Sequence, residues 1–274
     1  MSDVVLKTSR LSRYPILGSF LLLFLLLPYS DGVAEQKTEI VIIGMPHKET
    51  ESFGIHNLVE ILKRVKPDVI LFELPAEMMT SSFEFTVMQK DSLPQQAVLE
   101  YKKGTGVKIR PYDIDGRNAF YQRTNAQEDR CNQELNTAIN AKRLNSEAQK
   151  ILDLLMAANG KRDRIGQSEA AVINSFSSDL AINERLWLAT QGIPEIARLT
   201  PDLKECREFW DLSRAEWIRR NNQMVANIRR YSTEFQGCRL VVICGFEHRY
   251  YLHSHLYDWR DEPPAYTVKE YWQY

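Results

Sequence analysis

Two histidines follow two glycines at the same spacing. The first pair is GMPH at residues 44–47, the second is GFEH at residues 245–248, and each directly follows an apolar run. A glycine at the end of a strand permits a tight turn or a close backbone approach. The residue three positions later then lies near the start of the next helix. His47 and His248 are therefore placed to present a ring nitrogen to a metal ion or to act as bases.

Carboxylates follow two further predicted strands. Glu73 ends the run 69–72, and Asp113 and Asp115 come after the segment 107–111. Ligands of open parallel sheets bind beyond the carboxyl ends of the strands, so we expect these acids and the two histidines at one edge of a sheet. Histidines combined with carboxylates suit a divalent ion, without distinguishing zinc, manganese and cobalt. The predicted metal ligands are His47, Glu73, Asp113, Asp115 and His248.

The chemistry that such a site predicts is hydrolysis of a peptide or other carbonyl substrate. A metal ion with an open position lowers the pKa of bound water to about 7. Glu73 is predicted to be a metal ligand or the general base. Arg117, which follows the acidic turn, is assigned to substrate binding. Arg220 is predicted to hold substrate or to stabilise an oxyanion, although a solvated helix face is its default position.

Each of these residues also has an ordinary structural explanation. A lone histidine after a strand is usually a helix cap or a surface residue, and the repeated spacing is what favours a functional role for His47 and His248. Glu73 ends a buried run, and an ion pair with a buried arginine is its structural alternative. Asp113 and Asp115 lie in a glycine-containing turn, and turn chemistry alone accounts for them about as well.

The elements that must position these residues are those of an α/β fold. Four short strands are predicted. Segments 38–44, 69–73 and 239–244 are apolar and rich in β-branched residues, as buried strands of parallel sheets are, and the remaining strand is predicted at 107–111. Helical patterns occupy the connections between the first three strands, at 51–65 and 95–103. The predicted fold is a mostly parallel central sheet.

A large all-helical insertion, about 118–235, is predicted between the third and the last core strands. Within it, Asn159–Gly160 is expected to end a helix, as such residues often do. The C-terminal tail is aromatic and contains proline, and no element is predicted for it.

The N-terminus has the features of a secretory signal peptide. Basic residues precede the apolar stretch 16–27, and small residues follow it, so we predict cleavage after Ala34 and a periplasmic or secreted protein. The apolar stretch is short for a spanning helix, and no later segment of the mature chain is long and apolar enough to span. An uncleaved N-terminal signal anchor is the alternative.

Composition bounds the remaining possibilities. The chain has 274 residues, of which 44% are hydrophobic and 26% charged, which is typical of a globular protein. This length suits one large domain or two small ones, and because the strands on both sides of the helical insertion are expected in one sheet, a single domain is predicted at 35–274. A formal net charge of −1 gives no reason to expect a nucleic-acid partner. The four cysteines do not have the spacing of a zinc site or a redox pair, and Cys244, within an apolar segment, is expected to be a buried free thiol.

The quoted motifs resemble those of the TraB/PrgY/GumN/Tiki family. The likeness comprises the two G-x-x-H turns, the segment KPDVILFELP at 66–75, and RRNNQM at 219–224, which is similar to an Arg-Asn-x-x-Met helix of that family. Their order along the chain also agrees. Met45–Pro46 departs from the small or polar residues usual before the first histidine, and Pro46 removes a backbone N–H from the turn.

This resemblance implies an α/β core with helical insertions, as in the broader clan with erythromycin-esterase-like and ChaN-like proteins. It also implies a metal-dependent peptidase that uses His47, Glu73 and His248, with Arg220 and Asn221 as further site residues and Asn221 in substrate binding. Two alternatives stay open: a metal-free, esterase-like hydrolase with a histidine base, and a non-catalytic protein that binds or sequesters haem or a peptide in the same cleft.

Overall fold

A computed structural model describes residues 37–88, 91–257 and 265–274 of the chain. The predicted signal peptide, residues 1–34, lies outside the described residues. Within the described ranges, no helix has the length and apolar character needed to cross a membrane.

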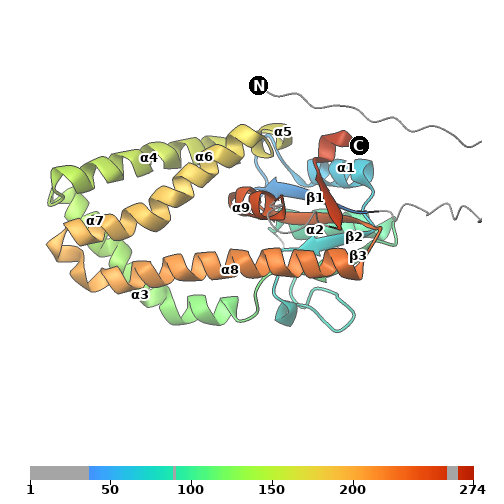
Figure 1. Ribbon diagram of the computed structural model, residues 1–274, viewed down its shortest axis with the longest axis horizontal. Helices are drawn as coiled ribbons and strands as arrows, with labels where there is room; N and C mark the ends of the chain where they lie inside the picture. Colours follow the sequence, from blue (N-terminus) through green and yellow to red (C-terminus); the bar gives the residue numbers. More distant parts are fainter. Residues whose placement is uncertain (1–36, 89–90, 258–264) are drawn as a thin grey trace, which may run out of the picture. The chain divides into compact units, whose positions relative to one another are not determined.

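The centre of the fold is a five-stranded sheet in which all neighbouring strands are parallel, in the order β3-β2-β4-β1-β5 (Figure 1). Its strands are β1 (Thr38–Met45), β2 (Val69–Phe72), β3 (Lys108–Pro111), β4 (Arg239–Gly245) and β5 (Tyr266–Lys269). The predicted parallel α/β fold is confirmed. The prediction that the C-terminal tail contains no element was wrong, because β5 pairs with the outer edge of β1.

The position of β4 determines which residues meet. Although it comes late in the chain, β4 lies between β1 and β2, with Met45 opposite Gly245 and Phe72 opposite Ile243. The first G-x-x-H turn, the second G-x-x-H turn and Glu73 therefore follow three adjacent strands. Parallel strands end at the same edge of a sheet, so residues far apart in sequence become neighbours there.

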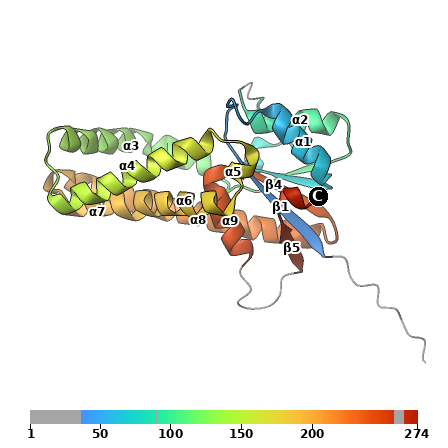
Figure 2. The same ribbon diagram turned by 90° about the horizontal axis from the view of Figure 1, so that it is seen from above.

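Helices cover both faces of the sheet (Figure 2). Helices α1 (Ile55–Val65) and α2 (Leu93–Lys103) pack on one face, and α8 (Arg207–Glu234) and α9 (Phe246–Leu256) pack on the other. Helix α1 buries one stripe of apolar side chains, as the helical period of its sequence predicts. Because both faces are covered, the inner strands are apolar throughout rather than alternating.

The predicted helical insertion between the third strand and β4 is present and has an apolar core of its own. It extends beyond the edge at which the strands end (Figure 1). Besides the first part of α8, its helices are α3 (Arg117–Asn140), α4 (Ser146–Gly166), α5 (Ala170–Ile173), α6 (Phe176–Trp187) and α7 (Ile193–Leu199).

A π-helical turn, Leu188–Gly192, joins α6 to α7, and short 3-10 turns occupy Ala76–Met78, Pro201–Cys206 and Tyr271–Gln273. A disulfide joins Cys131 of α3 to Cys206, directly before α8. Cys244 is a buried free thiol, as predicted.

The prediction that a helix ends at Asn159–Gly160 was wrong, because α4 continues to Gly166. Leu155 and Ala158 are buried in a small cluster with Leu188. Glycine costs a helix only about 1 kcal/mol relative to alanine, and this tertiary packing outweighs it.

One side chain of the insertion completes the sheet next to the first G-x-x-H turn. Strand β5 pairs with β1 only as far as Val41, so the backbone of Gly44 has no strand partner on that side. The buried side chain of Asn174 replaces it, accepting a hydrogen bond from Gly44 N at 2.7 Å and donating one to Gly44 O at 2.9 Å. Asn174 therefore joins the insertion to the strand that carries His47.

We expect Asn174→Ala to lower the free energy of unfolding by about 3 kcal/mol, because it leaves two buried backbone groups without partners. Urea denaturation measures this change. Asn136→Ala, at an exposed position of α3, is the matched control, with an expected change within about 0.5 kcal/mol. Equal effects of the two substitutions would contradict the structural role of Asn174.

Candidate functional site

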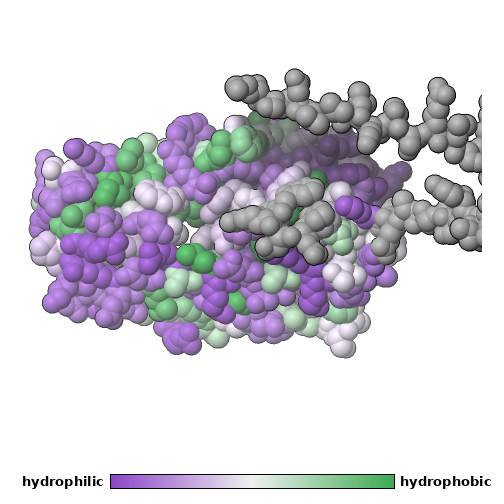
Figure 3. All heavy atoms as spheres, in the orientation of Figure 1, coloured by the Kyte–Doolittle hydropathy of each residue, from purple (hydrophilic) through white to green (hydrophobic). Residues whose placement is uncertain are grey.

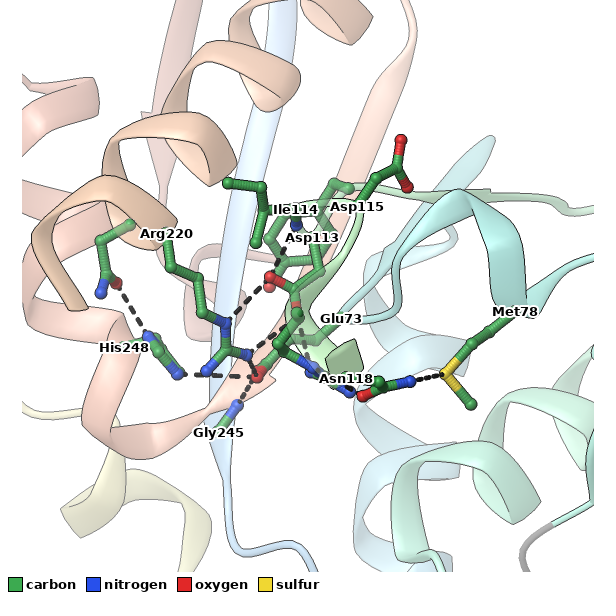
Figure 4. A network of polar contacts seen from close by, with 12 residues as sticks. Glu73, Met78, Asp113, Ile114, Asp115, Asn118, Arg220, Gly245 and His248 are labelled. Atoms are coloured by element: carbon green, nitrogen blue, oxygen red, sulfur yellow. Dashed lines mark hydrogen bonds and ion pairs between the residues drawn. The ribbon is translucent and has the colours of Figure 1, made fainter. Parts of the chain in front are cut away.

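The carboxylate of Glu73 is the centre of a polar network at the ends of the strands (Figure 4). Its Oε1 accepts a hydrogen bond from Arg220 Nη2, and its Oε2 accepts one from the backbone N–H of Gly245, each at 2.6 Å. The side chain is only 12% exposed. Burial alone would raise the pKa of this carboxyl, but His248, Arg220 and His47 nearby and the Gly245 N–H bring the pKa down to about 2. Glu73 is therefore ionised at neutral pH.

His248 lies beside Glu73 in a defined protonation state. Its Nδ1 is 2.8 Å from Asn221 Oδ1, and the Asn221 amide nitrogen donates to the carbonyl of Trp217 at 2.8 Å. Since the oxygen of Asn221 faces the ring, Nδ1 carries the proton and Nε2 has a free electron pair. Burial lowers the pKa of His248 from 6.5 to about 4, which Glu73 only partly opposes, so the ring is neutral at pH 7. Nε2 lies 3.6 Å from Glu73 Oε1.

His47 lies near Glu73, beside Gly245. Its exposed ring lies against the Cα of Gly245. A Cβ at position 245 would come within 2.8 Å of His47 Nε2 and 3.7 Å of Glu73 Oε2, so only glycine leaves room for this arrangement. The structure thus gathers His47, Glu73 and His248 at adjacent strand ends.

Gly44, the glycine of the first G-x-x-H motif, also leaves room for neighbouring residues. A Cβ at Gly44 would come within 3.0 Å of the Arg249 side chain and 3.1 Å of the Phe246 backbone, both on α9. Neither Gly44 nor Gly245 has a positive φ, so close packing rather than a special turn explains both glycines. Each G-x-x-H motif makes room for the other.

A second carboxylate, Asp113, holds two arginines in place. Arg220 donates to both of its oxygens at 2.9 Å, through Nε and Nη2, and Arg117 Nη1 donates to Oδ2 at 2.6 Å. The Asp113 side chain is fully buried. Although burial lowers the pKa of Arg220, Glu73 and Asp113 raise it well above its usual range. Two carboxylates and two guanidinium groups therefore balance in charge.

The remaining predicted site residues are placed differently from one another. Asp115 points away from Glu73 (Figure 4) and accepts a hydrogen bond from Ala76 N at 2.9 Å. Asn221 is fully buried, and its amide contacts His248 and Trp217 rather than a cavity. Among the described residues, no group of three or more His, Cys, Asp or Glu side chains is arranged to hold a metal ion.

A cavity of about 150 Å³ lies in front of this network. His47, Glu73 and Arg117 contribute its polar wall, and its apolar wall comes mainly from Met45, Phe72, Leu74, Pro94 and Ile243. Its volume corresponds to about five water molecules. The cavity accommodates an amino-acid-sized group rather than a large cofactor.

Sequence reasoning missed two contributions to the site. The ring of Trp217 stacks on His248 with centroids 4.5 Å apart and an interplanar angle of 16°. Its position one helical turn before Asn221 is the signal that would have identified it. The N–H of Gly245 was also missed, because backbone donors leave no trace in residue type.

Comparisons with family models, with curated proteins and with solved structures found no match to this chain.

The assigned state of His248 leads to a prediction about pH. The unfolded chain takes up this proton near pH 6.5 and the folded chain near pH 4, so His248 stabilises the fold above about pH 6.5 and this contribution is lost as the pH falls toward 4. We expect nitrogen NMR to show a neutral ring protonated at Nδ1 down to about pH 4. A ring protonated at Nε2 would contradict the assignment.

Asn221→Asp tests the same contact, because a carboxylate beside Nδ1 favours the imidazolium. We expect it to raise the pKa of His248 above about 5, measured by the same NMR titration. Asn222→Asp, at the neighbouring exposed position, is the control and should leave the His248 titration close to that of the unsubstituted protein.

Proposed function

We propose that the protein is a hydrolase that adds water to the carbonyl group of a substrate bound in the cavity beside His47 and Glu73. One observation carries this proposal: an ionised carboxylate at the wall of a cavity has two histidines nearby, one of them neutral with the free electron pair of its Nε2 3.6 Å from the carboxylate. Hydrolytic sites commonly contain bases and potential metal ligands held close together in a buried network.

A divalent metal ion fits one part of the site. Zinc lies about 2 Å from nitrogen and carboxylate ligands, so an ion shared by two ligand atoms holds them about 3–4 Å apart. The 3.6 Å between His248 Nε2 and Glu73 Oε1 is within that range. Asn221 holds the other nitrogen of His248 and Arg220 holds the carboxylate, as partners of metal ligands usually do. When bound, the ion would polarise a carbonyl and activate water.

The chain's own residues have separate roles in this proposal. Glu73 and His248 would hold the ion. His47, which is not arranged with them as a ligand group among the described residues, would have to move its exposed ring to become the third ligand. Arg220 fixes Glu73 and balances its charge. Asp113 keeps both arginines in position. Trp217 and Asn221 hold the ring of His248 and keep its Nε2 unprotonated.

A metal-free hydrolase is the second candidate, and a specific observation favours it. Arg220 and Gly245 already bind both oxygens of Glu73 at 2.6 Å, and the described residues contain no group of three ligands. In this alternative, His47 takes a proton from the attacking water at the cavity wall. A haem-binding role has less support, because pockets for drug-sized ligands have volumes of about 300 Å³ or more, and this cavity is smaller.

Metal analysis separates the two candidates. We expect the purified chain, incubated with Zn²⁺, Mn²⁺ or Co²⁺ and dialysed, to retain about one ion by mass spectrometry, with at least tenfold weaker binding in Glu73→Gln and His248→Phe. His56→Asn, at an exposed position of α1, is the control. Hydrolysis of a peptide library without bound metal, abolished by His47→Ala, would instead support the metal-free route. If the chain neither retains a metal ion nor hydrolyses the library, the proposal is overturned.

Gly245→Ala tests the packing of the site with a single methyl group. The new Cβ would meet His47 Nε2 at 2.8 Å, and the exposed ring can rotate away. We expect hydrolysis of the same library to fall at least tenfold while the melting temperature stays nearly unchanged, since misplaced catalytic groups cost about 100-fold. In Gly104→Ala no heavy atom lies within 4 Å of the added Cβ, so activity should be retained. Equal activity of both variants would exclude His47 from the reaction.

A further inference from the structure

Arg117 differs from Arg220 in how its guanidinium group is used. Arg220 donates to Glu73 and Asp113 and is only 8% exposed in its side chain. Arg117 is 18% exposed, lines the cavity, and makes its one short ionic contact through Nη1 to Asp113. Its Nε donates to Asn118 Oδ1 at 3.4 Å, and among the described residues its Nη2 donates to no partner. Arg117 thus presents an anchored cation with unused donors at the cavity wall.

The rest of the cavity limits what this cation can bind. Apart from His47, Glu73 and Ser92, its wall is formed largely by apolar side chains and the Gly245 backbone. A ligand in about 150 Å³ that contacts both Glu73 and Arg117 must place an anionic group within a few bonds of the carbonyl that is attacked. The net charge of Glu73, Asp113 and the two arginines is balanced, so a carboxylate is not opposed by an excess of negative charge.

Resting on the proposed function, we infer that the substrate is an N-acyl or peptidyl amino acid with a free α-carboxylate, which Arg117 binds, and with an apolar side chain, which the cavity wall contacts. The scissile carbonyl of such a compound is linked to the carboxylate carbon through only the nitrogen and the α-carbon, so both groups can occupy the one cavity that Glu73 and Arg117 line. Guanidinium–carboxylate pairs are among the strongest hydrogen-bonded contacts.

The reaction is then a C-terminal cleavage. Water adds to the acyl carbon, the bond from that carbon to nitrogen breaks, and one proton of the water passes to the departing amine. The products are a free carboxylic acid and a free amino acid. The acyl part extends past the exposed ring of His47, and the released amino acid occupies the cavity.

Binding of an inert analogue tests this assignment independently of turnover. Methanesulfonyl-L-leucine keeps the carboxylate and the apolar side chain, but its sulfonamide does not hydrolyse like an acyl bond; its carboxamide is the neutral counterpart. By calorimetry we expect the acid to bind at least tenfold more tightly than the carboxamide, in line with hydrogen bonds to charged groups. Arg117→Gln should abolish this preference, and Arg117→Lys should retain part of it.

Arg219→Gln, on the exposed side of α8, is the matched control and should leave the preference unchanged. Melting temperatures of all variants show whether the fold is intact. Equal binding of acid and carboxamide, or a preference that survives in Arg117→Gln, would overturn the inference. If the acid is preferred through Arg117 but N-acyl amino acids are not hydrolysed, the carboxylate site stands and the proposed hydrolase function fails.

Discussion

The site depends on the buried contact between Arg220 and the two carboxylates of Glu73 and Asp113. Each charge is costly to bury alone. Removing one partner of such a group leaves the other charges unpaired in the protein interior, which solvates them poorly. Glu73 follows β2, Asp113 follows β3, and Arg220 lies on a helix of the insertion. The same contact therefore joins two strand ends to the insertion and fixes the Glu73 carboxylate beside His248.

The order of the strands in the sheet brings the two G-x-x-H motifs together. Because β4 lies between β1 and β2, two motifs separated by about two hundred residues follow adjacent strands. Their glycines then have reciprocal roles: Gly245 leaves space for His47, and Gly44 leaves space for the helix that carries His248. The repeated Gly-x-x-His spacing is thus a requirement of mutual packing, which explains why two separate parts of the chain obey the same pattern.

Much of this arrangement can be predicted from the sequence, and the features that cannot be predicted share a physical cause. Buried strands, the helical insertion and the convergence of His47, Glu73 and His248 follow from apolar patterns and from the rule that parallel strands end together. The burial of Arg220 does not, because its neighbours in sequence are polar and its partners lie far away in the chain. Strand β5 was missed for the same reason: a short, polar-containing edge strand is defined by its pairing with β1, not by its own composition.

The insertion is a working part of the site rather than an addition to the sheet. Trp217, Arg220 and Asn221 occur at spacings of three and four residues, so one face of α8 presents all three. That face stacks on the ring of His248, fixes the proton on its Nδ1, and binds the carboxylate of Glu73. The sheet supplies the histidines and the acid, and α8 sets their orientation and protonation. Any reaction at this edge therefore requires the insertion to be folded and docked.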